Sequence, residues 1–342
     1  MDIRSCIPVV CVPVRNEEAL LPGLLDALAG QNFGPSLSVY FHLDGCTDGS
    51  GAFLEKIANS FPHTLLVEHS DGRGEPSAGR ARRAAVSMAL CNVGDHRNLC
   101  IMTTDADSTP ASDWVAAGVQ ALRFADLATG TVLRHEPHEL QDRVEAYFDR
   151  LHRYRRTVDP VTWDTVHGRH FSGAANFAIR GSVYIAMGGF EEFEVGEDAA
   201  LIDAASRAGY RVRRDPAMTV TTSSRREGRV RGGLATSLRG LDRYGLPMVD
   251  HPAAAAWQYR AQARARLVFG ELEHSREDVA WLARATSLAP DHILDVARDC
   301  PNDEAFAMRI VPAAPHPIRS IPLDEAEAAL DILEQPIRWK LS

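Results

Sequence analysis

Residues 98–110 have the sequence NLCIMTTDADSTP, and this stretch predicts the central strand of the fold. Residues 99–102 are apolar and two threonines follow them, a composition typical of a short buried strand. The strand ends at Asp105 and Asp107, and the chain is expected to turn at residues 108–110. Because side chains alternate along an extended chain, both carboxylates point the same way, into the crevice beyond the carboxyl edge of the sheet.

This D-x-D pair has two interpretations. A hard divalent cation such as Mg²⁺ or Mn²⁺ is commonly held by one or two carboxylates together with substrate phosphates, so the pair predicts a metal-diphosphate site. Aspartates in such a place also cap turns and the helices that follow them. The pair alone favours the second interpretation, and the motifs elsewhere in the chain decide between the two.

The preceding residues predict an alternation of strands and helices. Apolar runs at 6–14, 39–43 and 65–68 have the composition of buried strands, and residues 17–29, 52–60 and 79–90 have helical spacing. Together with the strand at 99–102 they give the order β-α-β-α-β-α-β. This order predicts an α/β fold with a single doubly wound, mostly parallel mixed sheet.

Composition limits the classes of protein and partner. The chain has 342 residues, 45% hydrophobic and 24% charged, which is ordinary for a globular protein with a sizeable core. A net charge of -9 argues against nucleic acid or an anionic membrane as the main partner. The six cysteines form no C-x-x-C pair, and no run approaches the roughly 18 apolar residues of a membrane span. We therefore expect a cytoplasmic protein without a transmembrane segment.

Polar groups follow four of the expected elements and should meet in one crevice. Each set alone has an ordinary explanation as a helix cap, a turn or a solvated helix face. Together they supply acids for a metal and a ribose, arginines for a diphosphate and a carboxylate for a base, which are the parts of a nucleotide site. The four sets are Arg15-Asn16-Glu17, Asp44 with Asp48, Arg80-Arg82-Arg83, and Asp105 with Asp107.

An ordered set of motifs covers roughly two thirds of the chain and is far more specific than any one of its members. This set resembles the family 2 glycosyltransferases, which have the A-type nucleotide-diphospho-sugar transferase fold. The motifs are PVRNEE (13–18), LDGCTDGS (43–50), AGRARRA (78–84), TDADS (104–108), SGAANFAIR (172–180), GGF (188–190), GEDAAL (196–201) and TSSRREGR (222–229).

The resemblance implies roles for individual residues. Asp107 would be the main metal ligand, with Asp105 supporting the ribose or the metal. Asp198, paired with Glu197 at a helix start, would be the catalytic base that accepts the proton of the acceptor hydroxyl. Donor contacts would come from Pro13, Arg15, Asn16, Glu17, Asp44, Arg82, Asp105, Arg225 and Arg229. Acceptor contacts would come from Gly173, Asn176 and Gly189, although Asn176 would equally serve as a hydrogen-bonding residue of the core and Gly189 as a helix C-cap.

The sequence departs from the family pattern at several positions. Leu43 and Asp44 stand where relatives often have two adjacent aspartates, and Arg83 replaces the usual Asn. Many relatives have a His after the strand at 217–221, where this chain has residues 221–224, TTSS. The third metal ligand is therefore unassigned. Arg225 and Arg229 belong to a Gly- and Arg-rich loop, which is either a lid over the diphosphate or a solvated loop.

We expect residues 1–247 to form the catalytic domain, with a donor-binding half (1–110) and an acceptor half (111–247). In the acceptor half, residues 144–156, VEAYFDRLHRYRR, predict an amphipathic helix whose arginines are solvated or bind phosphate. Residues 248–342 should form a helical extension with helices at 253–265, 277–285 and 323–333. This extension is expected to be a packing arm, an acceptor-site wall or a homodimer contact.

The leading hypothesis is a metal-dependent, inverting transfer of a sugar from a UDP- or GDP-sugar to a hydroxyl of a soluble small molecule or glycan. One alternative is a nucleotidyltransferase of related fold, which would have a Gly-rich phosphate loop where this chain has PVRNEE. The other is an inactive scaffold that binds nucleotide sugars.

Overall fold

The computed structural model describes residues 6–34, 36–72, 76–170, 173–311 and 318–341. Its largest element is an eight-stranded sheet with the order β3-β2-β1-β4-β7-β6-β8-β5, and β9 and β10 form a separate two-stranded sheet. The strands are β1 (Ile7–Val14), β2 (Ser38–Asp44), β3 (Thr64–Ser70), β4 (Leu99–Thr103), β5 (Ser108–Pro110), β6 (Leu127–Arg134), β7 (Phe177–Arg180), β8 (Val212–Thr222), β9 (Met248–Asp250) and β10 (Ser320–Pro322).

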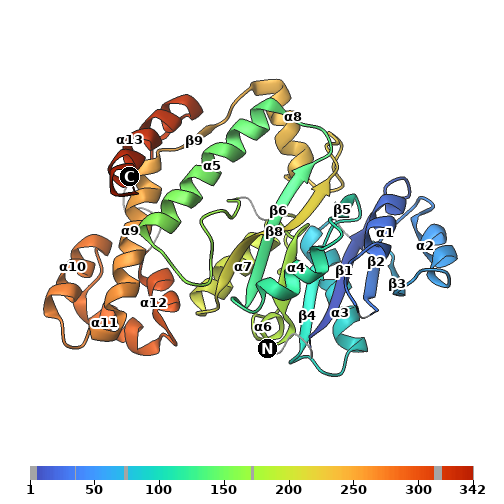
Figure 1. The fold of residues 1–342 in the computed structure, drawn as a ribbon, viewed down its shortest axis with the longest axis horizontal. Coiled ribbons are helices and arrows are strands. Elements are labelled where there is room, and N and C mark those ends of the chain that lie inside the picture. The colour runs from blue at the N-terminus through green and yellow to red at the C-terminus, as the bar shows by residue number, and fades with distance from the viewer. Residues whose placement is uncertain (1–5, 35, 73–75, 171–172, 312–317, 342) are drawn as a thin grey trace.

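Helices connect these strands and then make up most of the chain after β9 (Figure 1). They are α1 (Leu21–Ala29), α2 (Ser50–Ala58), α3 (Ala78–Asn92), α4 (Trp114–Ala121), α5 (Glu139–Val158), α6 (Gly181–Ala186), α7 (Glu197–Arg207), α8 (Leu234–Tyr244), α9 (Pro252–Val268), the 3-10 helix η2 (Phe269–Glu271), α10 (Arg276–Thr286), α11 (Pro290–Asp299), α12 (Asp303–Ile310) and α13 (Leu323–Leu341).

The main sheet is mixed and mostly parallel, as the sequence predicts. Strands β1 to β4 pair in parallel, and β7 is antiparallel to both β4 and β6. Strand β6 therefore runs in the direction of β4, and β8 is parallel to β6 while β5 opposes it. The carboxyl ends of β1, β2, β4, β6 and β8 consequently lie along one edge of the sheet.

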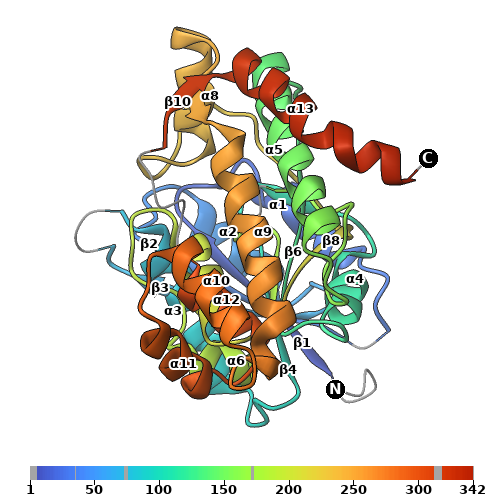
Figure 2. The same ribbon diagram turned by 90° about the vertical axis from the view of Figure 1, so that its left-hand side faces the viewer.

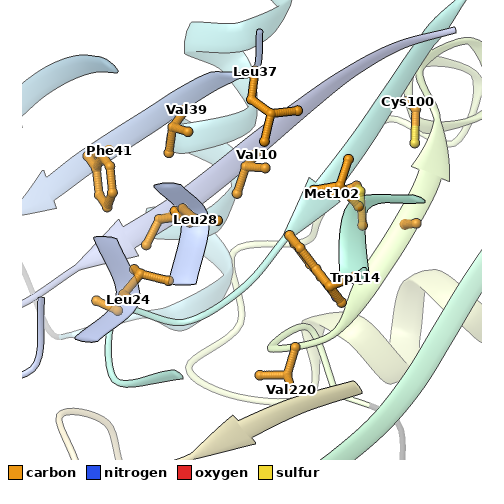
Figure 3. Close-up of a cluster of buried hydrophobic side chains, with 14 of the residues drawn as sticks. Val10, Leu24, Leu28, Leu37, Val39, Phe41, Cys100, Met102, Trp114 and Val220 are labelled. Atoms are coloured by element: carbon orange, nitrogen blue, oxygen red, sulfur yellow. The ribbon is translucent and has the colours of Figure 1, made fainter. Parts of the chain in front are cut away.

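Helices cover both faces of the sheet because its strands are apolar on both sides. Val10 and Val12 of β1 pack with α1 and α4, in the cluster that includes Trp114, whereas Val9 and Cys11 pack on the opposite face with α3, α6 and α7. Figure 3 shows part of the first cluster, in which Leu24 and Leu28 face Val10 and Trp114 lies beside Met102. This double-sided burial is what defines a doubly wound sheet.

Several elements differ from the sequence-based expectation. Residues 108–110 form strand β5 rather than a turn, because Ser108 pairs with Thr222, which lies more than a hundred residues later in the chain. Residues 234–244 form α8, which follows the predicted loop. Leu234, Leu238 and Leu241 have helical spacing, and the helix buries Leu238 and Leu241, but the glycines and arginines that precede it hide this signal.

The C-terminal helices gather at the side of the molecule opposite β2 and β3 (Figure 1). Residues from α9 to α12 bury a hydrophobic cluster of their own around Leu282 and Phe306. A further cluster joins α5 to the tail through Tyr147, Ile321 and Leu330. In Figure 2 helix α9 stands alongside α5, so the expected extension is packed firmly onto the acceptor half, while the domain boundary at residue 247 stays a prediction.

Candidate active site

A cavity of about 890 Å³ opens along the carboxyl edge of the main sheet. Its walls come from the ends of β1, β2, β4, β6 and β8, from the N-terminus of α7, and from α5 and α8. The predicted site residues that line it are Pro13, Arg15, Glu17, Asp44, Arg82, Asp105, Asp107, Gly173, Glu197, Asp198, Arg225 and Arg229. The four expected sets of polar residues therefore meet at one place, although Asn16, Asp48, Arg80 and Arg83 are not among the lining residues.

Asp105 and Asp107 both line this cavity because the residue between them is anchored in the core. Ala106 is 3% exposed and packs in the cluster under α1 and α4, which turns its two neighbours toward the opposite side. The side chain of Asp107 accepts a hydrogen bond from Thr222 Oγ1 at 3.4 Å. Ser108 in turn donates to Thr222 at 3.0 Å, so the β5-β8 pairing fixes the position of Asp107.

Each of the two aspartates has an arginine partner. Arg82 Nη1 lies 2.9 Å from Asp105 Oδ1, and Arg225 Nη2 lies 3.1 Å from Asp107 Oδ2. Burial raises the pKa of Asp107 to about 6, and the nearby carboxylates of Asp105 and Glu17 contribute to the rise while Arg225 opposes it. Burial thus makes the charge of Asp107 unfavourable despite Arg225, and a cation bound beside this carboxylate would favour its ionised form.

Arg82 connects the D-x-D pair to the start of α7. Its Nε donates to Glu197 Oε1 at 3.0 Å and its Nη1 donates to Asp105 and to the carbonyl oxygen of Ala174. Burial alone would lower the pKa of Arg82, but the two carboxylates raise it above its usual value. Arg82 is only 5% exposed, so it acts chiefly by holding the carboxylates in position.

Glu197 and Asp198 stand at the N-terminus of α7 but have different surroundings. Glu197 is 4% exposed and engaged by Arg82, and burial together with Asp198 raises its pKa against the effect of Arg82. Asp198 is more open, and its Oδ2 accepts the backbone N–H of Ala174 at 2.9 Å. Gly173 borders the same oxygen, since a Cβ at that position would lie 3.6 Å from Asp198 Oδ2. Asp198 is therefore the better placed of the two to receive a proton.

Arg225 and Arg229 bring the loop after β8 across the end of β1. Arg225 Nη1 lies 2.6 Å from Glu17, and Arg229 Nε lies 3.1 Å from the same carboxylate. Arg229 also donates to the backbone carbonyl of Arg15 at 3.0 Å. The loop therefore lines the cavity, and its role as a lid over the diphosphate stays a prediction.

At the end of β2, Asp44 is buried and lies 2.9 Å from Arg15 Nη1. The turn after Asp44 requires glycine, because a Cβ at Gly45 would lie 2.8 Å from the Cα of Gly72. Asn16 does not line the cavity: its Oδ1 accepts the backbone N–H of Thr47 at 2.7 Å and so ties the first two loops together.

Two of the three predicted acceptor residues lie outside the cavity. Asn176 is fully buried, and its side chain bonds Trp114 Nε1 and the carbonyl oxygens of Thr131 and Met218. These hydrogen bonds give Asn176 a role in the core, which is one of the two roles that the sequence left open. Gly189 has a φ of 81°, and a Cβ there would lie 2.8 Å from the Tyr184 hydroxyl, so its role is to form the turn after α6.

The structure adds wall residues that the motifs did not reveal. On the side of α5, Arg169 Nη1 lies 2.6 Å from Asp149 Oδ2, and both residues line the cavity. Helix α8 and the residues after it contribute an apolar wall with Leu241, Tyr244 and Leu246. In the sequence, the helical spacing of the leucines at 234–241 is the signal that could have predicted the α8 part of this wall.

The oxygen atoms of the site suit a hard divalent cation only if substrate supplies part of the coordination. Within the described residues, no group of three or more His, Cys, Asp or Glu side chains forms a ready metal site. Asp105 and Asp107 offer carboxylate oxygens beside the Thr222 hydroxyl, at the place where the sequence lacks the expected His. Two carboxylates with phosphate oxygens and water are a common ligand set for Mg²⁺.

The family model described as Glycosyl transferase family 2 matches residues 9–179, half of the sequence. This chain belongs to glycosyl transferase family 2. The match includes β1 to β4, Arg82, Asp105 and Asp107, and it ends before Asp198 and the arginine loop. The mixed sheet with its helices on both faces is the A-type fold that the sequence predicts for a family 2 glycosyltransferase.

Solved structures of glycosyltransferases resemble this family 2 chain at low sequence identity. *S. aureus* TarS 1-349 in complex with UDP-GlcNAc is 15% identical, with 89% of each chain covered and a TM-score of 0.49. The mannosyltransferase PcManGT from *Pyrobaculum calidifontis*, in complex with GDP-Man and Mn²⁺, is 18% identical, with 89% of this chain and 86% of that chain covered and a TM-score of 0.48. No curated protein matches the chain. In the part of the chain that the structure describes, no helix has the length and apolarity needed to cross a membrane.

Proposed function

We propose that this chain is an inverting, metal-dependent glycosyltransferase that moves a sugar from a UDP- or GDP-sugar to an acceptor hydroxyl. The observation that carries this proposal is the meeting of Glu17, Asp105 and Asp107 with Arg225 and Arg229 in one cavity. In a family 2 glycosyltransferase, such a combination suits an anionic donor whose diphosphate is the leaving group.

The donor would lie with its nucleoside toward β1 and β2 and its diphosphate toward β4. Pro13, Glu17 and Asp44 line the first part, where Glu17 would accept hydrogen bonds from a ribose. Asp107 and Asp105 would hold Mg²⁺ or Mn²⁺, which supplies charge stabilisation to the leaving diphosphate when it is bound. Arg225 and Arg229 would then turn from Glu17 and Asp107 toward the phosphate oxygens.

Asp198 would act as the catalytic base. Its carboxylate accepts the proton of the acceptor hydroxyl while that oxygen bonds the anomeric carbon of the sugar. The bond from the anomeric carbon to the diphosphate oxygen breaks at the same time, and its electron pair leaves with the nucleoside diphosphate. A single displacement of this kind inverts the anomeric centre and needs no carboxylate nucleophile.

The acceptor would enter between α5, α7 and α8. Gly173 leaves open space beside Asp198, and the wall carries the Asp149–Arg169 ion pair together with apolar residues of α8. We propose a hydroxyl-bearing small molecule or glycan as the acceptor, with polar contacts at α5 and apolar contacts at α8.

Release of nucleoside diphosphate from a panel of UDP- and GDP-sugars, in the presence of Mn²⁺ or Mg²⁺, tests the proposal. Release of UDP or GDP that increases with added acceptor glycans supports sugar transfer. Formation of pyrophosphate from a nucleoside triphosphate and a sugar phosphate would indicate nucleotidyl transfer instead. Saturable donor binding without turnover of any donor would indicate an inactive scaffold.

A further inference from the structure

A second cavity, of about 340 Å³, lies between the sheet and the C-terminal helices. Its walls come from α5, α7, β8, α9 and α12 and from residues 163–170, and it shares no lining residue with the active-site cavity. Helix α9 packs on α5, as Figure 2 shows, and α12 packs on α7. Residues from both parts of the chain therefore line the cavity. A volume of this size is within the range of small-molecule sites.

Three arginines in this cavity have buried nitrogen atoms without partners. The Nε atoms of Arg155, Arg156 and Arg214 are buried and have no hydrogen-bond partner. The Arg156 side chain is 6% exposed. The sequence left open whether the arginines of residues 144–156 are solvated or bind phosphate, and Arg156 is not solvated. Because buried donors are almost always satisfied in folded proteins, such a group points to a missing acceptor.

Among the described residues, only two carboxylates reach these three guanidinium groups, and each is shared between two arginines. Asp159 Oδ2 accepts a long hydrogen bond of 3.4 Å from Arg156 Nη2 and also pairs with Arg266. Asp164 Oδ2 lies 3.8 Å from the Nη1 atoms of both Arg156 and Arg214, beyond hydrogen-bonding distance. Its Oδ1 is used by the backbone N–H groups of Arg214 and Thr165. Among the described residues Arg155 has no carboxylate partner, and its Nη2 donates to Gln262 Oε1 at 3.3 Å.

The ionisation of the basic groups agrees with this surplus of positive charge. Burial and the neighbouring Arg155 lower the pKa of Arg156 to about 10, and burial also lowers the pKa of Arg214. Burial and Arg214 lower the pKa of His170 to about 3. Arg266, in the same cavity, behaves differently: despite its burial, Glu304 and Asp159 raise its pKa. The cavity therefore has the well-paired Arg266 on one side and, on the other, three arginines that have only shared carboxylate partners.

We propose that this second cavity binds a phosphate group, free or carried by a small phosphorylated metabolite, between the guanidinium groups of Arg155, Arg156 and Arg214. Phosphate oxygens accept the paired N–H groups of arginine and would supply the missing acceptors. Trp163, Ile202 and Met308 give the same cavity apolar wall for the remainder of a metabolite. The segment that carries Asp164 and His170 also carries Arg169 of the active-site wall, so a bound phosphate would brace that wall.

Isothermal titration calorimetry of the full-length protein with inorganic phosphate, and separately with glucose 6-phosphate, tests this proposal at constant ionic strength. We expect saturable binding of at least one probe, and a change in Trp163 fluorescence that a Trp163→Phe variant lacks. Tighter binding of glucose 6-phosphate would identify a phosphorylated metabolite as the source of the phosphate group, and equal or weaker binding would identify the free ion.

Arg156→Met should weaken the binding of phosphate about tenfold or more, because it removes one charged donor group. Its unfolding temperature without phosphate should equal or exceed that of the wild type, since Asp159 keeps Arg266 and Asp164 keeps Arg214. Arg153→Gln, an exposed change on the same helix, is the matched control and should bind like the wild type. If Arg156→Met does not fold, Arg155→Gln has the same expected effect on binding.

Absence of saturable binding of both probes at millimolar concentration would overturn the proposal. Equal affinities of the Arg156→Met, Arg155→Gln and Arg153→Gln variants would also overturn it, because the phosphate would then bind elsewhere. A large fall in the unfolding temperature of phosphate-free Arg156→Met would also contradict the proposal. It would mean that carboxylates of the protein already neutralise Arg155, Arg156 and Arg214, and that these arginines only join the two parts of the chain.

Discussion

The guanidinium group of Arg225 lies 3.1 Å from the carboxylate of Asp107, so an arginine stands where we propose a divalent cation. The same arginine also contacts Glu17, the residue proposed to bind the ribose. A positive side chain at this point neutralises the carboxylates as long as no donor is bound. Donor and cation together would have to displace it, and the diphosphate offers it a new partner.

Replacement of Arg225 should separate its effect on cation binding from its effect on the leaving diphosphate. Arg225→Gln removes a cation from beside Asp107, so Mn²⁺ should bind about threefold or more tightly in the absence of donor. Sugar transfer by this variant should be slower, because the leaving diphosphate loses a charged partner. Electron paramagnetic resonance of free Mn²⁺ measures the first effect and nucleoside diphosphate release the second. Arg231→Gln, an exposed change in the same loop, is the control. Unchanged or weaker Mn²⁺ binding by Arg225→Gln would contradict this account.

Asp107→Asn should remove activity without harming the fold. We expect turnover of the donor to fall by about 10²- to 10³-fold, because the variant loses the charge proposed to hold the cation. The unfolding temperature should stay equal or rise, since burial beside other carboxylates already makes the Asp107 charge unfavourable. Asp113→Asn, at an exposed position, makes the same chemical change as a control. A parallel loss of stability and activity would instead assign Asp107 a structural role.

Asp198 and Glu197 should respond differently to amide substitution. Asp198→Asn should lower kcat by about 10²- to 10⁴-fold and leave donor affinity nearly unchanged, because the amide can still accept the Ala174 N–H but cannot take a proton. Glu197→Gln should mainly lower stability, since it weakens the ion pair with the buried Arg82. Donor affinity by fluorescence titration and kcat by product release distinguish the two. Equal losses of donor affinity and kcat in Asp198→Asn would show that Asp198 is not the catalytic base.

Arg82 should be the most important of these residues for stability. Arg82→Met leaves Asp105 and Glu197 without their shared cation in a largely buried place, which should cost about 3–5 kcal/mol of unfolding free energy. Urea denaturation measures this loss, and Arg97→Met, with a side chain that is 93% exposed, provides the control. A loss below about 1 kcal/mol, the range of surface ion pairs, would mean that water replaces the guanidinium group.

The buried His152 should make stability depend on pH. Burial and Arg214 lower its pKa to about 4, whereas an unfolded chain has a histidine pKa near 6.5. The unfolded state therefore binds more protons between these values, and stability falls as the pH drops through 6.5. This one residue should account for about 2 kcal/mol lost between pH 7 and pH 5.

His152→Gln should keep the hydrogen bond to the Thr165 carbonyl oxygen and lack this titration. Urea denaturation at pH 7 and pH 5 should therefore show a smaller loss for the variant than for the wild type. Equal losses in both proteins would mean that His152 does not carry the effect.

The sequence predicted the donor half well because its signals are local. Three of the four polar sets come directly after a buried strand, so the order of strands and helices places Glu17, Asp44 and Asp107 at one edge of the sheet. Parallel pairing of β1 to β4 then follows from the connecting helices. The strand at residues 108–110 was missed because its pairing partner, β8, is remote in the chain.

The ion pairs and the acceptor wall could not be predicted because they join distant parts of the chain. Nothing near Glu17 in the sequence indicates that Arg225, 208 residues away, will bind it. The sequence left an acceptor contact and a core role open for Asn176, and it could not indicate the three buried groups from other elements that take up its hydrogen bonds. Helix α8 and the cationic second cavity likewise depend on packing between residues far apart in the sequence.

The central claim is that Asp107 holds a divalent cation. The most direct test compares the wild type with Asp107→Asn: metal is removed with EDTA, and donor turnover is measured as Mn²⁺ is added. We predict that the wild type regains release of UDP or GDP in a saturable way as Mn²⁺ is added, and that Asp107→Asn does not. Full activity of the wild type in EDTA, or the same Mn²⁺ dependence in both proteins, would contradict the proposal that Asp107 holds a cation against the leaving diphosphate.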